Sequence, residues 1–261
     1  IVLYLSYINI GVQSIMKLQK LYSQVRRAID DYQMIQPNDK IAVGISGGKD
    51  SLTLLYALAG LRKFYPVPFE LIAISVDLGY PDFDLREVKK LCSKLQVEYH
   101  IIKTQIGEIL TNTTQKGSPC SLCAKLRKGA LNQAVKDLGC NKVAYAHHMD
   151  DIIETMFLSL IFEGRFYSFS PVTHLDRMDL TVIRPLMYVL EADVIGFKNK
   201  YELPVVHNPC PADGYTKREY AKQLVRQIHH ENPGSKQQIF HAIINGNMEG
   251  WPSLISPMKK G

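Results

Sequence analysis

The sequence is poor in cysteine, with five in 261 residues, and it has a single tryptophan. A small and odd number of cysteines cannot form the dense disulfide framework of small secreted domains. No internal repeat and no low-complexity segment is present, which argues against solenoids and long disordered linkers. Basic residues exceed acidic ones only by 31 to 25, so net charge alone indicates no more than tolerance of a polyanionic partner.

Long hydrophobic runs are also missing. Residues 1–15 are apolar and uncharged, but polar residues interrupt them and they are short for a membrane span. Positive charge follows this stretch instead of preceding it, unlike in a signal peptide. We therefore expect residues 1–15 to be an extension or an added element, and the protein to be cytoplasmic with no membrane partner.

Short apolar runs alternate with helical patterns along most of the chain. The runs predict five strands, at 41–45, 71–76, 97–102, 143–146 and 182–183. Helical patterns cover 18–29, 51–64, 84–95, 123–138, 150–162, 191–201, 216–231 and 235–247, and residues 103–120 look irregular. Apolar strands that alternate with helices predict an α/β fold with a doubly wound, mostly parallel five-stranded sheet. Such sheets bind ligands beyond the carboxyl ends of their strands.

A glycine turn follows the first predicted strand and leads into a helix. Its residues are candidate ATP contacts: Ser46, Gly47, Gly48, Lys49, Asp50 and Ser51. Two glycines let the backbone approach an anion, and the amides and dipole of the next helix then face it. Because Lys49 is followed by Asp50, this is not a Walker A loop. It is similar to the PP-loop of ATP pyrophosphatases, which release AMP; Asp50 can hold Mg²⁺, and Asp77, after the second strand, can touch nucleotide or metal.

Three of the cysteines form a second candidate site. Cys120 and Cys123 make a C-x-x-C motif at the start of a predicted helix, and Cys210 lies far along the chain, after His207. All three are expected in irregular segments beside strand ends. A redox pair, a zinc site completed by His207, and an iron–sulfur cluster on three thiolates all stay open from spacing alone. The other two cysteines are predicted to be structural thiols: Cys92 and Cys140.

Basic residues follow both parts of this cysteine motif. They are Lys125, Arg127 and Lys128 after the first part, and Lys217, Arg218, Lys222 and Arg226 after the second. Either segment alone would be an ordinary solvated helix face. Two such helices converging on one site favour a docking surface for a phosphate backbone.

The fourth predicted strand ends in two histidines followed by two carboxylates. Asp150 or Asp151 is a natural N-cap for the next helix. At the ligand edge of a sheet, the same residues suit metal binding or acid–base chemistry. We expect Asp150 or Asp151 near Mg²⁺ and His147 or His148 near the substrate.

Taken together, these segments resemble the tRNA 2-thiocytidine synthetase family of PP-loop tRNA thiolation enzymes. The matching segments are Ser46–Ser51, Cys120–Gly129, Ala146–Thr155, Thr181–Leu186 and Cys210. The resemblance implies that ATP adenylates the C2 oxygen of a tRNA pyrimidine, with cytidine the expected base, and that sulfur then displaces AMP. It implies ATP, Mg²⁺ and a [4Fe-4S] cluster as cofactors.

The same resemblance implies roles for single residues and for partners. The cluster is held by Cys120, Cys123 and Cys210, with zinc the alternative occupant, and Arg127 lies near the substrate. Asp50 and Asp151 fall at acidic positions implicated in catalysis or metal binding, and we expect Asp150 to be catalytic as well. Partners are tRNA, a sulfur donor such as a cysteine desulfurase product or sulfide, and a second copy in a homodimer. The family commonly has another C-x-x-C around the third ligand, which this chain lacks.

The expected organisation has four parts. They are the extension at 1–15, an N-terminal helix at 16–38, a PP-loop ATP pyrophosphatase domain with the iron–sulfur site at 39–215, and a C-terminal helical segment at 216–261. Two other functions stay open. One is a PP-loop ligase or amidating enzyme without sulfur transfer, and the other is a zinc-stabilised protein that only binds nucleotide and tRNA.

Overall fold

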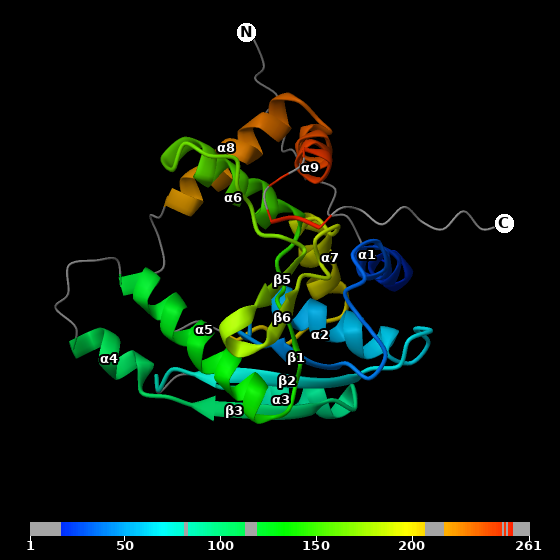
Figure 1. Ribbon diagram of the computed structural model, residues 1–261, viewed down its shortest axis with the longest axis vertical. Helices are drawn as coiled ribbons and strands as arrows, with labels where there is room; N and C mark the ends of the chain where they lie inside the picture. Colours follow the sequence, from blue (N-terminus) through cyan, green and yellow to red (C-terminus); the bar gives the residue numbers. More distant parts are fainter. Residues whose placement is uncertain are drawn as a thin grey trace, which may run out of the picture.

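A computed structural model describes residues 17–80, 83–112, 119–206, 217–246, 248 and 250–252. Its centre is a six-stranded sheet with the order β3-β2-β1-β4-β6-β5 (Figure 1). The strands are β1 Lys40–Gly44, β2 Glu70–Asp77, β3 Glu98–Lys103, β4 Lys142–Ala144, β5 Val172–Leu175 and β6 Leu180–Ile183. Every neighbouring pair is parallel except β5 with β6. The α/β class and the mostly parallel sheet are confirmed.

The prediction of five strands is wrong because it misses β5. This strand is an edge hairpin partner of β6, joined to it by a 3-10 turn and by Asp179, whose φ is +45°. Its residues are only partly buried or exposed, so they lack the apolar run that marks the central strands. The irregular segment expected at 103–120 also contains a helix, α4 Ile106–Asn112.

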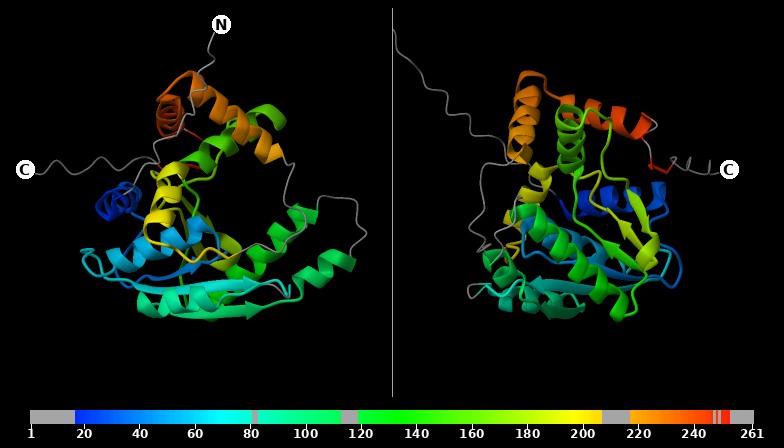
Figure 2. Two further views of the ribbon diagram at one scale, coloured as in Figure 1. Left: turned by 180° about the vertical axis from the view of Figure 1, so that it is seen from behind. Right: turned by 60° about the vertical axis from the view of Figure 1, so that its left-hand side comes forward.

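Helices cover both faces of the sheet, as the alternating pattern predicts (Figures 1 and 2). One face of β1 packs its Ile41 and Val43 in a core with α1 Leu18–Asp31, α2 Lys49–Leu61, α3 Arg86–Lys94 and α7 Glu191–Lys200. The other face packs Ala42 with α5 Pro119–Asp137. Alternate residues of one strand therefore enter different cores, which is why the central strands are apolar throughout.

The remaining helices lie beyond one edge of this layered body. They are α6 Met149–Phe162, α8 Lys217–Glu231 and α9 Ser235–Asn245, and both α8 and α9 pack against α6 (Figure 2). Within the described residues, no helix has the length and apolar character needed to cross a membrane. The division of the chain into four parts stays a prediction.

The strand order shows where the ligand-binding edge of the sheet lies. From β1 the chain moves outward to β2 and β3, and then returns to β4 on the other side of β1. Doubly wound sheets bind ligands at such a reversal, between the carboxyl ends of the two strands. The glycine turn after β1 and the histidine segment after β4 both lie there.

Two cysteines confirm their expected structural role. Cys92 on α3 and Cys140 before β4 are buried, and burial raises the pKa of each thiol to about 11. A thiol that stays protonated is a poor metal ligand and a poor nucleophile.

Candidate active site

The turn Ser46–Ser51 joins β1 to α2 at this reversal. Gly47 has a φ of +82°, and a Cβ there would lie 3.0 Å from the Cβ of Val206. Only glycine fits both conditions without strain. Gly48 is the N-cap of α2, so the first amides of the helix and the positive end of its dipole mark an anion site.

Hydroxyl groups hold the turn in shape. The Ser46 amide donates to Ser51 Oγ at 3.2 Å, and Ser51 Oγ donates to the Gly48 carbonyl at 3.0 Å. The Gly48 amide donates to Ser46 Oγ at 3.3 Å. A phosphate oxygen is a stronger acceptor than a hydroxyl, so this last amide can exchange its partner when an anion binds.

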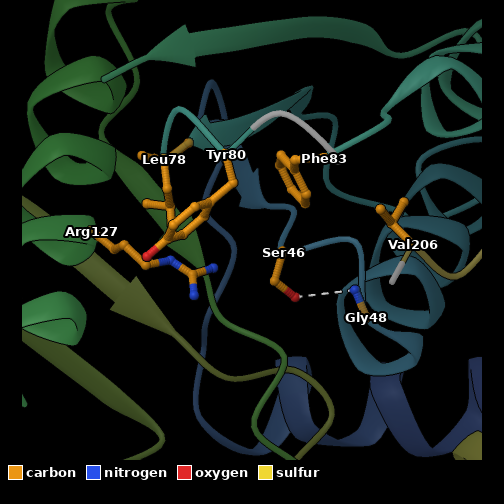
Figure 3. Close-up of a pocket in the computed structure, with 8 residues that line it drawn as sticks. Ser46, Gly48, Leu78, Tyr80, Phe83, Arg127 and Val206 are labelled. Atoms are coloured by element: carbon orange, nitrogen blue, oxygen red, sulfur yellow. Dashed lines mark hydrogen bonds between the residues drawn. The ribbon is translucent and has the colours of Figure 1, made fainter. Parts of the chain in front are cut away.

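A small cavity of about 270 Å³ opens beside the turn (Figure 3). Ser46, Gly48 and Arg127 supply its polar side. Its apolar side is formed by Val76, Leu78, Tyr80, Phe83 and Val206. An apolar slot with a few polar groups suits a flat heteroaromatic ring.

A larger cavity of about 510 Å³ lies over the carboxyl ends of β1, β2 and β4. The turn contributes Ser46, Asp50 and Ser51, and α5 contributes Arg127 and Lys128. The opposite wall includes Tyr145, His147, Asp151, Phe169 and Arg184. Because Ser46, Val76 and Arg127 line both cavities, the two spaces adjoin each other.

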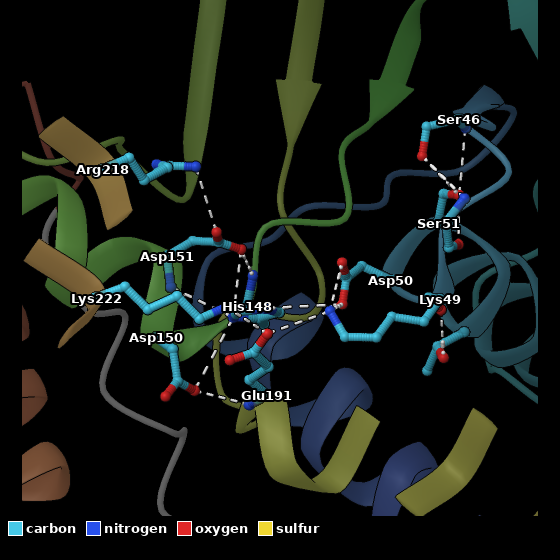
Figure 4. A network of polar contacts seen from close by, with 12 residues as sticks. Ser46, Lys49, Asp50, Ser51, His148, Asp150, Asp151, Glu191, Arg218 and Lys222 are labelled. Atoms are coloured by element: carbon cyan, nitrogen blue, oxygen red, sulfur yellow. Dashed lines mark hydrogen bonds and ion pairs between the residues drawn. The ribbon is translucent and has the colours of Figure 1, made fainter. Parts of the chain in front are cut away.

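The prediction that Asp150 or Asp151 caps α6 is wrong, because the N-cap is His148. Its Nδ1 accepts from the Asp151 amide at 3.3 Å, and the Asp151 carboxylate accepts from the His148 amide at 3.0 Å. This reciprocal capping box needs a carboxylate at the third position of the helix, which Asp151 supplies. His148 Nε2 is also 3.7 Å from Asp50, so the imidazole lies between two carboxylates of the larger cavity (Figure 4).

Asp150 has a different environment from Asp151. It is only 2 % exposed, accepts from the Glu191 amide at 2.7 Å and pairs with Lys236 of α9. Asp150 is not among the described residues that line either cavity. Its contacts join α6 to α7 and α9, and a catalytic role for it stays a prediction.

Lys49 takes part in an ion network (Figure 4). Its Nζ lies 3.0 Å from Asp50 and 3.3 Å from Glu191, and Glu191 also pairs with Lys222 at 2.8 Å. Burial opposes the charge of Glu191, but its hydrogen bond to Lys222 and the charge of Lys49 together lower its pKa to about 2. Glu191 could not be singled out from the sequence, because an acidic residue in the first turn of a helix is ordinary.

Asp77 is the last residue of β2. Its carboxylate accepts from the Gly79 amide at 2.9 Å, which makes it a turn residue. Among the described residues it lines neither cavity. Contact between Asp77 and nucleotide or metal stays a prediction.

His147 lies in the wall of the larger cavity, held between an aromatic ring and a cation. Phe169 stacks on it at 4.4 Å between centroids, and Arg184 Nε donates to its Nδ1 at 3.2 Å. Burial, followed by the charge of Arg184, lowers the pKa of His147 to about 3. The ring is therefore neutral at physiological pH. Arg184 follows β6 within the segment Thr181–Leu186, but its partner could not be read from the sequence.

The two basic helices do converge on this region. Arg127 and Lys128 of α5 line the larger cavity. From α8, Arg218 pairs with Asp151 at 3.5 Å and Lys222 pairs with Glu191. Part of the positive charge predicted to dock phosphates is thus neutralised by carboxylates of the site.

The C-x-x-C motif lies at the start of α5, which confirms its predicted place at the start of a helix, whereas the expectation of irregular chain at Cys120 and Cys123 is wrong. Cys123 packs with Val76 and Leu78, which places it at the carboxyl end of β2, near the turn. The side chain of Cys120 and the whole of Cys210 and His207 lie outside the described residues. No group of three His, Cys, Asp or Glu in the described ranges is placed to hold a metal.

The chain on either side of Cys210 reaches the site. Val206 donates its amide to the Gly47 carbonyl at 2.9 Å. After residues 207–216, α8 begins at Lys217, next to the Arg218 that pairs with Asp151.

Comparison with known proteins places these features in a family. Residues 13–228 match the model of the PP-loop domain. The tRNA-cytidine(32) 2-sulfurtransferase of Geobacter sulfurreducens is 38% identical over 232 residues, which cover 88% of this chain and 90% of that protein. The protein of the same name from Geotalea daltonii is 40% identical over 230 residues, or 87% and 91% of the two chains.

A solved structure shares the fold. The U34-tRNA thiolase NcsA from Methanococcus maripaludis, with its [4Fe-4S] cluster, has a TM-score of 0.73 and 25% identity. The match covers 89% of this chain and 80% of that one.

Proposed function

The chain belongs to the PP-loop domain family and, within it, to the tRNA-cytidine(32) 2-sulfurtransferases; on this premise we propose that it adenylates the C2 oxygen of a tRNA cytidine with ATP and replaces that oxygen with sulfur. The observation that carries this reaction is the junction of the two cavities at Ser46 and Arg127. A nucleotide and a second substrate can meet there, with the reacting phosphorus between them.

ATP binds across the junction. Its adenine enters the small cavity, between the side chains of Tyr80, Phe83 and Val206. Its phosphates lie against the turn at Ser46–Ser51, where glycine and the helix dipole favour an anion. The cytidine enters the larger cavity, which has aromatic side chains at Tyr145 and Phe169.

In the first step, the C2 oxygen bonds to the α-phosphorus while the bond to the β-phosphate oxygen breaks. Pyrophosphate leaves, and the base carries AMP. Negative charge grows on the α-phosphate, so a fixed cation at that point lowers the barrier. Arg127 serves this purpose because it lines both cavities, with the amides of α2 on the other side.

Mg²⁺ fits the carboxylates of the larger cavity. Asp50 and Asp151 both line it, on either side of the His148 imidazole. One or two carboxylates together with substrate phosphates form the usual magnesium environment. These two residues would hold the ion, and its positive charge would offset the negative charge of pyrophosphate as it leaves.

A cluster on Cys120, Cys123 and Cys210 fits the same edge of the sheet. Cys123 packs against residues at the end of β2, and Cys210 follows in the sequence four residues after Val206, whose amide donates to the Gly47 carbonyl of the turn. The cluster would supply a site that presents sulfur to the activated carbon. Sulfur then bonds to C2 as the C2–oxygen bond breaks and AMP leaves.

The partners follow from this chemistry. Substrate tRNA is the polyanion that the basic helices α5 and α8 accept. The sulfur comes from a cysteine desulfurase product or sulfide, and we place the reaction in the cytoplasm, where tRNA is. We also propose that the protein forms a homodimer, that Asp77 contacts nucleotide or metal, and that Asp150 takes part in catalysis.

The reaction can be reconstituted from purified protein. Anaerobic protein with its cluster, unmodified tRNA, ATP and sulfide should yield 2-thiocytidine, detected by mass analysis of nucleosides, together with AMP. Arg127→Ala should reduce the rate at least about a hundredfold. Lys136→Ala, an exposed cation at the opposite end of the same helix, is the matched control and should keep most of the activity. A thiolated uridine, or no thionucleoside at all, would reject the proposed function.

A further inference from the structure

Exposed aromatic side chains flank α6, at its far end from the cavity and on the loop that returns from there along the helix. Most of the large apolar side chains that are exposed in the described chain are found there, either on the last turn of α6, in the loop after it, or on the first turns of α8. Four of them are aromatic and form what we call the aromatic patch: Phe162 at 43 % exposure, Phe166 at 71 %, Tyr167 at 42 % and Tyr220 at 55 %. Such a concentration of apolar surface marks an interaction site.

The aromatic patch is covered by cations instead of by other apolar groups. Lys217 Nζ lies 4.7 Å from the centroid of Phe162, and the Arg165 guanidinium lies 4.9 Å from that of Tyr167. Phe162 and Tyr220 meet edge to face at 6.2 Å. Rings beside cations can stack with bases while the cations contact the phosphates that join them.

Both parts of the aromatic patch lead back to the larger cavity. The loop after α6 carries Phe166 and Tyr167 and then runs along the helix, because Ser168 Oγ donates to the carbonyl of Ile152. The next residue, Phe169, stacks on His147 in the cavity wall. On α8, the residue after Lys217 is Arg218, which pairs with Asp151.

The distance suits a strand that continues beyond the modified base. α6 has 14 residues, so about 20 Å separates its N-terminus at the cavity from Phe162 at its other end. A polynucleotide that places one base in the cavity must pass over the neighbouring surface with the next ones. Unpaired nucleotides expose the faces that aromatic side chains bind.

We propose that unpaired nucleotides flanking the modified cytidine of the substrate RNA stack on the aromatic patch, while Lys217 contacts their phosphates. This inference rests on the proposed function. Charge favours RNA over a second copy of this chain, since a copy would bring Lys217 up against its own counterpart, whereas Arg165 is already paired with Glu163. A second copy is the alternative outcome of the test.

The test measures tRNA affinity and its dependence on salt, using full-length protein with its cluster. Phe166→Ala with Tyr167→Ala, and separately Tyr220→Ala, should each weaken binding roughly 5- to 100-fold per lost stack, with the slope of log affinity against log salt unchanged. Lys217→Gln should lower that slope by about one. Tyr220→Phe keeps a ring and should bind normally. Phe64→Ala, another exposed aromatic at 54 %, is the matched control and should have no effect.

Different results would reject the role of the aromatic patch and the proposed function. ATP binding and thermal stability of the patch variants should match wild type, which separates loss of RNA contact from loss of fold. Unchanged tRNA affinity in the alanine variants would overturn the patch even if the wild-type protein makes 2-thiocytidine. A change in oligomeric mass without a change in tRNA affinity would also overturn it and would assign the surface to a second copy. Absence of thiolation with patch-dependent tRNA binding would instead reject only the reaction.

Discussion

His147 accepts a hydrogen bond from the guanidinium of Arg184, which does not release its proton. The Arg184 guanidinium is a donor only, so Nδ1 of His147 must be the bare nitrogen and Nε2 must carry the hydrogen. Because the pKa of His147 is lowered to about 3, the ring cannot act as a base or as a cation near neutral pH. Its remaining ability is to donate one hydrogen bond, like a neutral imidazole that polarises an oxygen.

Nitrogen NMR of His147 checks this tautomer. Between pH 5 and pH 8 we expect nitrogen chemical shifts typical of the Nε2–H tautomer, and these shifts should not change with pH. His147→Gln, which can still donate a hydrogen bond, should retain more thiolation activity than His147→Ala. A ring that titrates near its ordinary pKa would contradict the contact with Arg184.

Glu154 is a second residue whose protonation the fold controls. It is 4 % exposed on α6, and burial, helped by Asp151, raises its pKa to about 7. When the pKa of a carboxyl is higher in the folded protein than in the unfolded chain, the group contributes its full share of folding stability at pH values below its pKa in the unfolded chain. That stability is lost as the pH rises through its pKa in the folded protein. From about pH 4.5 to pH 7, the fold therefore loses stability at this residue.

Replacing Glu154 by Gln should remove this loss. The free energy of unfolding of Glu154→Gln, measured with urea, should exceed that of wild type by roughly 1–3 kcal/mol at pH 8 and by much less at pH 5. Glu87→Gln, at an exposed position of α3, is the matched control and should show no such trend. Equal differences at both pH values would show that Glu154 does not titrate in this range.

The elements themselves follow closely from hydrophobic pattern where they are buried. β1, β2, α2 and α6 lie within a few residues of their predicted ranges, since apolar runs and helical periodicity are strong signals there. The side chains of β5 are only partly buried or exposed and carry no such pattern, and α4 has only seven residues, too few to show a helical period. The N-cap of α6 was misplaced because histidine is a less common cap than aspartate.

The turn between β1 and α2 gives a prediction at the scale of an element. Gly47→Ala should lower stability by about 1 kcal/mol through its positive φ, and should also weaken ATP binding at least about tenfold because of the contact with Val206. Gly139→Ala has a similar φ of +70° with nothing within 4 Å of the added Cβ, so it is a matched control. The Gly139→Ala variant should lose stability but keep its affinity for ATP. Equal ATP affinity in both variants would contradict the assigned phosphate site.

At the scale of the whole molecule, the ligand-binding edge where the strand order reverses could be predicted from the sequence. The pairing of charges from distant segments could not. The sequence placed the turn after β1 and the histidines after β4 on one edge, because parallel strands share that edge. It could not show that Glu191 pairs with Lys49, or that Arg184 holds His147, since these contacts depend on how far-separated segments pack. The two adjoining cavities likewise arise from residues of many elements.

The account assigns ATP chemistry to the turn and sulfur chemistry to the cysteines, at one edge of the sheet. ATP radiolabelled at its α-phosphorus separates the two steps in a single measurement of label on tRNA. Cys123→Ala should still release pyrophosphate and transfer labelled AMP to tRNA, which accumulates without forming 2-thiocytidine. Arg127→Ala should transfer no label, and Cys92→Ala, at a buried structural thiol, should complete the reaction. Formation of ADP, or thiolation by Cys123→Ala at the wild-type rate, would contradict the account.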